Sequence, residues 1–359
     1  MKSISLCMIV KNEEKVLERV LKNAKIYADE IIIVDTGSTD NTIEIAKKYT
    51  DKVYDFEWCD DFAAARNYSF SLAKSDYIMW LDADDIVPED TALYISNLKS
   101  IMDKDVYMLK YTNGFRDNGE AIFSYYRERI IRNSRLAIWK GAVHECITPF
   151  GEVERVNKSI EHHSIKTTKS RRNLDIYIKT KKTRNLTPRE QYYMGREYYD
   201  NQEYSDCINT LQTFLTEGKG WVENNIDACV VISNAYNILN QKEKELDYLL
   251  MTFRFDQPRA NVCYYIGNYF FDKRDYYLAI YWYNMSITCN DVSSKGAFVH
   301  KDYYDYLPYL QLCLAYFKLN NIAKAYNYNE LAYSIYQNET TTNNRQFFID
   351  NYPQLINEV

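Results

Sequence analysis

The first 82 residues alternate between short apolar runs and amphipathic stretches, and this alternation restricts the fold more than any other feature of the chain. The runs are rich in Val and Ile and apolar on both faces, as strands of a covered parallel sheet are. The stretches between them carry apolar residues at helical spacing. The predicted strands are 5–10, 30–35, 52–58 and 76–82, and the predicted helices are 16–27, 43–49 and 62–75. Repeated strand–helix units predict an α/β domain with helices on both faces of the sheet.

Polar residues follow three of the predicted strands. Lys11 and Asn12 follow the first, Asp35 ends the second, and the sequence DADD (82–85) ends the fourth. Parallel sheets bind ligands beyond the carboxyl ends of their strands, so we expect these side chains to converge on one site.

The DADD sequence places three carboxylates within four positions at a strand end. Such carboxylates repel one another and lose solvation, so an opposing charge must offset the cost. A divalent cation that also holds a diphosphate would do so, and Mn²⁺ or Mg²⁺ suits a site of few carboxylates plus phosphates. The alternative is a solvated loop whose acids cap a helix that begins near Pro88.

Several motifs resemble, in order and spacing, those of family 2 glycosyltransferases, which have the GT-A fold. They are MIVKNEE, IIIVDTGSTDNT, AAARN and MWLDADD. Two later motifs, WKGAVHE (139–145) and IEHHS (160–164), resemble the bacterial subgroup with a C-terminal tetratricopeptide-repeat domain. That subgroup includes peptide and protein glycosyltransferases of the bacteriocin (glycocin) S-glycosyltransferase type. The resemblance implies transfer of a hexose from a nucleotide-diphosphate sugar.

The resemblance also implies roles for the nucleotide-binding residues. Asp35 would recognise the base, a uracil imide, so the expected donor is a UDP-hexose. Lys11, Asn12 and Glu13 would line the same pocket. Arg66 would lie near the diphosphate or brace the DADD loop, and a helix-surface arginine is the alternative.

For metal binding, the resemblance implies that Asp82-Ala83-Asp84 is the DxD motif. Asp82 would face the ribose and the metal, and Asp84 would hold the metal that bridges the phosphates. His162 would be a further metal ligand, whereas Asp85 is placed only in the neighbourhood.

Inverting transfer needs a base to accept the acceptor's proton, on the side opposite the departing diphosphate. We expect Glu145 to be that base, because its motif follows the hairpin-like segment 124–133 on the acceptor side. A buried ion pair with an arginine is the alternative for Glu145. Trp139 is either a platform for the sugar or acceptor or a core residue.

The second half of the chain predicts an all-α repeat domain. Small or key residues recur in pairs that are twelve positions apart. The first residues of successive pairs are separated by 38, 34 and 46 residues, near the usual repeat length of 34 in tetratricopeptide repeats. The pairs are Gly195 with Cys207, Ser233 with Glu245, Gly267 with Ala279, and Cys313 with Ala325. We therefore predict a catalytic domain at 1–165, a connecting helix at 166–189 and a repeat domain at 190–359. The repeats would hold a peptide or protein acceptor, and a homodimerisation arm is the alternative.

Composition restricts the partners and the location. The net charge of −6 argues against a general nucleic-acid or anionic-membrane binder. No apolar run approaches the roughly 20 residues that a membrane span needs. The eight cysteines are scattered without CxxC spacing, which indicates reduced thiols and a cytoplasmic protein. Two alternative functions remain: transfer to a cell-surface glycan or lipid-linked acceptor, and a non-catalytic repeat scaffold with a decayed transferase half.

Overall fold

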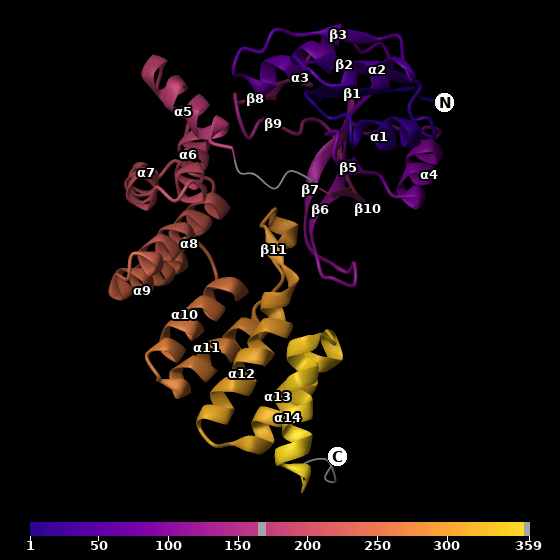
Figure 1. Cartoon of the computed structure of the whole chain (residues 1–359). Coiled ribbons are helices and arrows are strands. Elements are labelled where there is room, and N and C mark those ends of the chain that lie inside the picture. Colours follow the sequence, from indigo (N-terminus) through magenta and orange to yellow (C-terminus); the bar gives the residue numbers. More distant parts are fainter. Residues whose placement is uncertain (164–169, 355–359) are drawn as a thin grey trace. The chain divides into compact units, whose positions relative to one another are not determined.

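The computed structural model describes residues 1–163 and 170–354, and the chain divides into two compact units, Met1–Tyr193 and Met194–Val359 (Figure 1). The first boundary predicted from the sequence, at 165/166, lies outside the described residues, and the predicted domain limits stay a prediction. Each unit is described separately below.

The first unit is built on a mixed sheet with the strand order β3-β2-β1-β4-β7-β6-β10-β5. Strands β1 to β4 run parallel, whereas β7 runs antiparallel to both β4 and β6, and β5 runs antiparallel to β10. The strands are β1 (Ile4–Val10), β2 (Glu30–Asp35), β3 (Val53–Asp55), β4 (Tyr77–Trp80), β5 (Asp85–Ile86), β6 (Val106–Phe115), β7 (Ala121–Arg132) and β10 (Val153–His162). The α/β fold predicted from the sequence is confirmed, and the antiparallel strands β7 and β5 make its sheet mixed.

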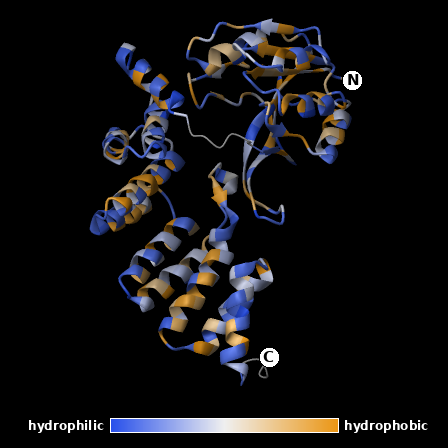
Figure 2. Ribbon diagram, in the orientation of Figure 1, coloured by the Kyte–Doolittle hydropathy of each residue, from blue (hydrophilic) through white to orange (hydrophobic). Residues whose placement is uncertain are grey.

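Alternate residues of the central strands bury their side chains on opposite faces of this sheet. On β2, Ile31 and Ile33 belong to one apolar core, and Ile32 and Val34 belong to the other. The first core includes residues of α1 (Leu17–Ala24), α2 (Thr42–Lys47) and α4 (Glu89–Leu98), and the second includes residues of α3 (Phe62–Ser71). Figure 2 shows hydrophobic colours along these strands. Burial on both faces explains why the strands are continuous apolar runs.

The segment that follows the sheet's central hairpin returns to the face covered by α3. Strands β6 and β7 form this hairpin. The segment 124–133, expected from the sequence to be hairpin-like, instead lies in the single strand β7 up to Arg132, because its partner strand is the preceding β6. Beyond the hairpin, β8 (Trp139–Lys140) and β9 (Cys146–Ile147) form a small antiparallel ladder. Asn67 of α3 fixes this ladder, because its side chain donates to the carbonyl of Trp139 and accepts from that residue's N–H. The WKGAVHE motif is thereby attached to α3.

Helices follow from residue 172 onward. They are α5 (Arg172–Thr183), α6 (Pro188–Asp200), α7 (Tyr204–Glu217), α8 (Val222–Ile238), α9 (Lys242–Met251), α10 (Ala260–Asp272), α11 (Tyr276–Thr288), α12 (Tyr306–Lys318), α13 (Ile322–Ile335) and α14 (Glu339–Asn351). The boundary between the two units lies inside α6.

The helices of the second unit repeat in the predicted register. The turn inside each helix pair places one non-glycine residue in the left-handed region, at Gln202, Asn240, Arg274 and Asn320. Their separations are the 38, 34 and 46 residues predicted from the small positions. In one pair, Ser233 Oγ donates to the carbonyl of Glu245, the partner predicted twelve residues away. The predicted tetratricopeptide-type repeat is confirmed.

The longest spacing has a structural cause. Residues 289–305, between α11 and α12, form an insertion that contains two short 3₁₀ helices and β11 (Val299–His300). The insertion lengthens this repeat, and it is attached to α11, because Ser286 Oγ donates to the carbonyl of Tyr303 at 2.6 Å.

Candidate active site

The loops after β1 and β2 are joined to each other by side chains. Asn12 has a φ of 56°, a conformation that asparagine tolerates better than most residues. Its Oδ1 accepts a hydrogen bond from the Thr39 N–H at 2.7 Å, and its own N–H donates to Ser38 Oγ at 2.9 Å. The Glu13 N–H donates to Thr42 Oγ1 at 2.7 Å. Asn12 and Glu13 therefore hold the shape of one loop pair at the carboxyl edge of the sheet.

Asp35 is buried in this loop pair and uses only one of its carboxylate oxygens. Oδ2 accepts hydrogen bonds from the N–H groups of Gly37 and Ser38, both at 2.9 Å. Oδ1 is also buried, and it has no hydrogen-bond partner among the described residues. A buried carboxylate oxygen without a partner is costly unless a ligand donates to it. Lys11, which directly follows β1 at the same edge, is exposed.

Arg66 of α3 bridges two carboxylates from distant parts of the chain. Its Nη2 lies 2.7 Å from Asp82 Oδ1, and its Nε lies 2.6 Å from Glu145 Oε1. The guanidinium is buried and faces the rings of Trp80 and Trp139 at 5.0 and 4.9 Å. Arginine is suited to such a site, because its planar fork stacks on aromatic rings while it pairs with carboxylates. Arg66 is therefore a brace and not a helix-surface residue.

Trp139 belongs to the core and not to an open surface. Its side chain is 2% exposed, and its ring packs edge-on against Trp80 and Phe70. The sequence left two roles for Trp139, a platform for the sugar or acceptor and a core residue, and the structure supports the core residue.

Asp85 is fully buried and completely engaged with protein groups. Its Oδ2 lies 2.9 Å from Nη1 of Arg129, and its Oδ1 accepts from the Tyr111 hydroxyl at 3.0 Å. Arg129 is itself fully buried and stacks on the Trp80 ring at 3.8 Å. Burial raises the pKa of Asp82, but Arg66 and Arg129 outweigh this and lower it to about 2. Two of the three DADD carboxylates are thus compensated by arginines.

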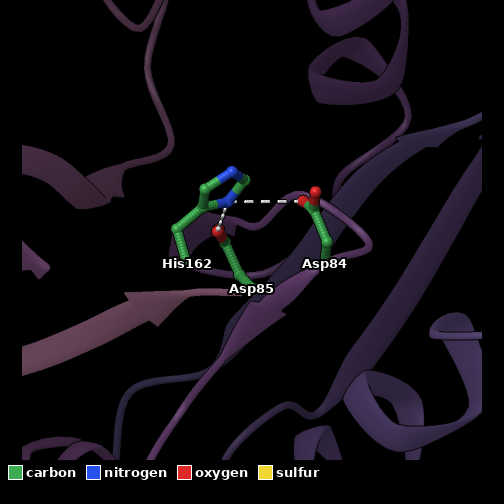
Figure 3. A group of neighbouring side chains, drawn as sticks. All are labelled: Asp84, Asp85 and His162. Carbon is green, nitrogen blue, oxygen red and sulfur yellow. Dashed lines mark hydrogen bonds and ion pairs between the residues drawn. The ribbon is translucent and has the colours of Figure 1, made fainter. Parts of the chain in front are cut away.

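Asp84 is the acid of this loop that faces a histidine instead of an arginine. Strand β5 pairs with β10 so that His162 lies opposite Asp85, which explains why the distant IEHH motif reaches the DADD loop. His162 Nδ1 lies 3.5 Å from Asp84 Oδ1 and 3.4 Å from Asp85 Oδ1, and both dashed lines in Figure 3 meet that one ring nitrogen. Burial raises the pKa of Asp84, and the neighbouring acids add to this against the effect of His162. The hydrogen bond to Asp85 raises the pKa of His162.

These three residues fit a divalent cation. Asp84, Asp85 and His162 each offer a ligand atom within 4.8 Å of the others. A metal-binding histidine usually donates its second ring N–H to a carboxylate, and the Asp85 carboxylate lies 3.4 Å from the His162 ring. Asp82, predicted as a ligand, is not in this group and is paired with Arg66. Ala83, between Asp82 and Asp84 in the sequence, is buried, with 5% of its surface exposed. The ligand roles of Asp82, Asp84 and His162 stay predictions.

Three residues that build this site were not singled out from the sequence. Arg127 and Arg129 lie on β7, and the guanidinium of each faces the Trp80 ring. Tyr111 on β6 bonds to Asp85. The only signal was the alternation in RERIIR (127–132), which puts both arginines on one face of a strand. The pairing of β7 with β4, which brings that face to Trp80, was not visible in the sequence.

The N-terminal unit matches a known protein family. The model of glycosyl transferase family 2 matches residues 5–151, which contain every site residue above except His162. Residues 5–151 are therefore similar to family 2 glycosyltransferase domains. This match agrees with the α/β domain followed by tetratricopeptide-type repeats that the motifs predicted.

Individual relatives cover different shares of the chain. The prophage-derived glycosyltransferase SunS of Bacillus subtilis is 25% identical over 267 residues, 69% of this chain and 61% of SunS. A tetratricopeptide-repeat-containing protein of Synechococcus elongatus is 46% identical over 85 residues, 24% of this chain and 21% of that protein. The chain thus spans less than two thirds of either relative. The structure of S. aureus TarS 1–349 in complex with UDP is 14% identical, with a TM-score of 0.40, and the match covers 68% of this chain and 88% of that 1–349 chain.

No helix in the described ranges, 1–163 and 170–354, has the length and apolar character needed to cross a bilayer.

Proposed function

We propose that this chain is a metal-dependent, inverting glycosyltransferase that moves a hexose from a UDP-sugar to a cysteine, serine or threonine side chain of a peptide or protein. The observation that carries the proposal is the placement of Asp84 against His162 at the carboxyl edge of a family 2 domain. The family resemblance supplies the reaction class, and the geometry supplies the roles below.

In this proposal, the loops after β1 and β2 bind the nucleotide. Asp35 Oδ1 is a buried acceptor that receives no hydrogen bond from the described residues, and the N3–H of uracil would donate one to it. Asn12 fixes the loop that carries Lys11 and Glu13, and the exposed Lys11 is free to approach phosphate. These features favour a uridine or thymidine nucleotide over a cytidine nucleotide, whose base lacks the imide N–H.

Asp84 and His162 would hold Mn²⁺ or Mg²⁺, and Asp85 would orient the imidazole. A bound divalent ion supplies Lewis-acid stabilisation of a departing diphosphate. Arg129 and Tyr111 keep the Asp85 carboxylate in place, because they occupy its two oxygens. Asp82, with one oxygen bound by Arg66, is positioned at the same edge for the ribose.

Glu145 is the proposed base. Arg66 occupies Oε1 of Glu145, so Oε2 is the oxygen that would accept the proton of the acceptor. The ion pair with an arginine, which was the alternative for Glu145, is present. The pair and the base role are compatible if Arg66 orients the carboxylate, in the way that a base is oriented by a third group.

The repeat unit would hold the acceptor, which is the usual use of the concave face of a helical solenoid. Binding energy from such a remote contact would position a flexible acceptor chain at the base. The cytoplasmic location expected from composition stays a prediction.

The proposal is tested by incubating the full chain with UDP-glucose, UDP-galactose or UDP-N-acetylglucosamine and Mn²⁺, and by measuring the release of UDP. We expect slow release of UDP and free sugar from at least one donor without acceptor, and none after chelation of the metal. No release from any donor, with UDP bound normally, would favour the non-catalytic scaffold. Faster release with an undecaprenyl-linked acceptor than with peptides would favour the lipid-linked alternative.

A further inference from the structure

Two cysteines of the second unit lie close together. The Sγ atoms of Cys263 on α10 and Cys289, the residue after α11, are 3.9 Å apart, and neither forms a disulfide. The backbones of the two helices also approach here, because Ser286 Oγ donates to the carbonyl of Ala260 at 2.7 Å. A disulfide requires an Sγ–Sγ distance of about 2.0 Å, so the two sulfurs must approach by about 2 Å to form a bond.

The two thiols differ in access and in acidity. Cys263 is buried, whereas Cys289 is partly exposed. The hydrogen bond from Cys263 lowers the pKa of the Cys289 thiol, burial opposes this, and the positive charge of Arg259 adds to the lowering. The pKa of Cys263 is raised, chiefly by the same hydrogen bond and then by burial. Cys289 is therefore the better nucleophile, and Cys263 is the thiol that can follow it.

We propose that Cys289 and Cys263 form a thiol–disulfide exchange site that reacts with a peptide or low-molecular-weight disulfide. The Cys289 thiolate attacks one sulfur of the substrate, the substrate S–S bond breaks, and one half leaves as a thiolate. Cys263 then attacks Sγ of Cys289, which forms the Cys263–Cys289 bond and releases the second half. The proton of the Cys263 thiol passes to the departing thiolate. The substrate disulfide is reduced and the protein pair is oxidised. This site does not depend on the glycosyltransferase activity proposed above.

The test uses the folded full chain with oxidised glutathione, followed by intact-mass measurement and peptide mapping without reduction. We expect a Cys263–Cys289 link in the wild-type protein. In Cys263→Ser the second step is blocked, so glutathione should remain attached to Cys289. Cys289→Ser should give neither the link nor an adduct on the buried Cys263. Cys313→Ser, a matched buried cysteine on α12, should behave like the wild type. An adduct on the exposed Cys59 shows that the reagent is active.

Two results would overturn the proposal. One is a wild-type protein with adducts on Cys59 but no link between Cys263 and Cys289. The other is a link that forms only after urea is added, which would mean that the folded protein keeps the two sulfurs apart. Both results can be read from the wild-type protein alone, so they do not depend on the folding of any variant.

Discussion

Arg66 Nε donates to Glu145 Oε1 at 2.6 Å, although 79 residues separate the two in the chain. This bond attaches the VHE loop to α3, and the second arm of the guanidinium attaches Asp82 to the same point. The proposed base and the first acid of the DADD loop are therefore placed by one buried residue. The proposed site depends on this brace for its geometry.

Replacement of Arg66 by Met should destabilise the protein strongly. The change leaves Asp82 and Glu145 without their cation, and removal of one partner from a buried ion pair costs roughly 3 kcal/mol or more. Urea unfolding would measure this loss. Lys158→Met is the control, because Lys158 pairs with Asp90 at the surface and should cost less than about 1 kcal/mol. Equal losses in the two variants would show that Arg66 is not a structural brace.

Asp35→Asn should weaken nucleotide binding with little change in folding. The amide can still accept from the Gly37 and Ser38 N–H groups, but its NH₂ group would then face the imide N–H of the base. A lost hydrogen bond to a charged group is worth about 1.5–3 kcal/mol, so the dissociation constant of UDP should rise about tenfold or more. Calorimetry with UDP and CDP would test this, with Asp55→Asn as the control. The account of base recognition fails if UDP affinity is unchanged or if the variant discriminates UDP from CDP as well as the wild type.

Glu245→Gln should stabilise the repeat unit at neutral pH. Glu245 is 5% exposed, at the contact position paired with Ser233 in the second repeat. Burial raises its pKa, and Lys242, 3.1 Å away, only partly offsets this. A carboxyl whose folded pKa lies above its unfolded pKa favours folding below the unfolded value, and this advantage is lost as the pH rises through the folded value. The variant should therefore have a higher Tm than the wild type at pH 7, and the difference should shrink towards pH 4. A pH-independent difference would contradict this explanation.

A fragment that ends at Asn201, after α6, should be more stable than one that ends at Thr187, before α6. The start of α6 packs within the first unit: Glu190 pairs with Arg184 at 2.6 Å, and Tyr193 stacks on His144 with ring centroids 4.2 Å apart. Circular dichroism melting would compare the two fragments. The longer fragment should bind UDP like the full chain but transfer sugar poorly to a peptide. Full transfer by this fragment would make the repeats a docking or dimerisation arm.

The strands, the helices and the repeat register could be predicted because each rests on local periodicity or fixed spacing. The carboxyl-edge position of Asn12, Asp35 and DADD followed from the order of strand and helix alone. The charges that compensate DADD could not be predicted in this way. A cation was expected to offset three acids, whereas Arg66 and Arg129 pair with two of them.

These compensating charges could not be predicted because the residues that make the contacts are far apart in the sequence. Arg129 reaches Asp85 because β7 pairs antiparallel with β4, and His162 reaches Asp85 because β10 pairs with β5. Such registers depend on the assembly of the whole sheet, which a single sequence does not specify. Motif resemblance could bring His162 to the site, but it could not show that Asp85 orients the imidazole.

The metal dependence of UDP binding in Asp84→Asn tests the central claim most directly. Asp84 is the DADD acid whose carboxylate pairs with no arginine among the described residues. Removal of this carboxylate should therefore affect cation binding and not the fold. Calorimetry would measure UDP affinity with Mn²⁺ and with chelator, in the wild type, in Asp84→Asn and in the exposed control Asp90→Asn. A coupling of about 1–3 kcal/mol corresponds to roughly 5- to 150-fold tighter binding with metal. We predict this gain in the wild type and in Asp90→Asn, and its absence in Asp84→Asn. The same gain in all three proteins would contradict the assignment of the metal site.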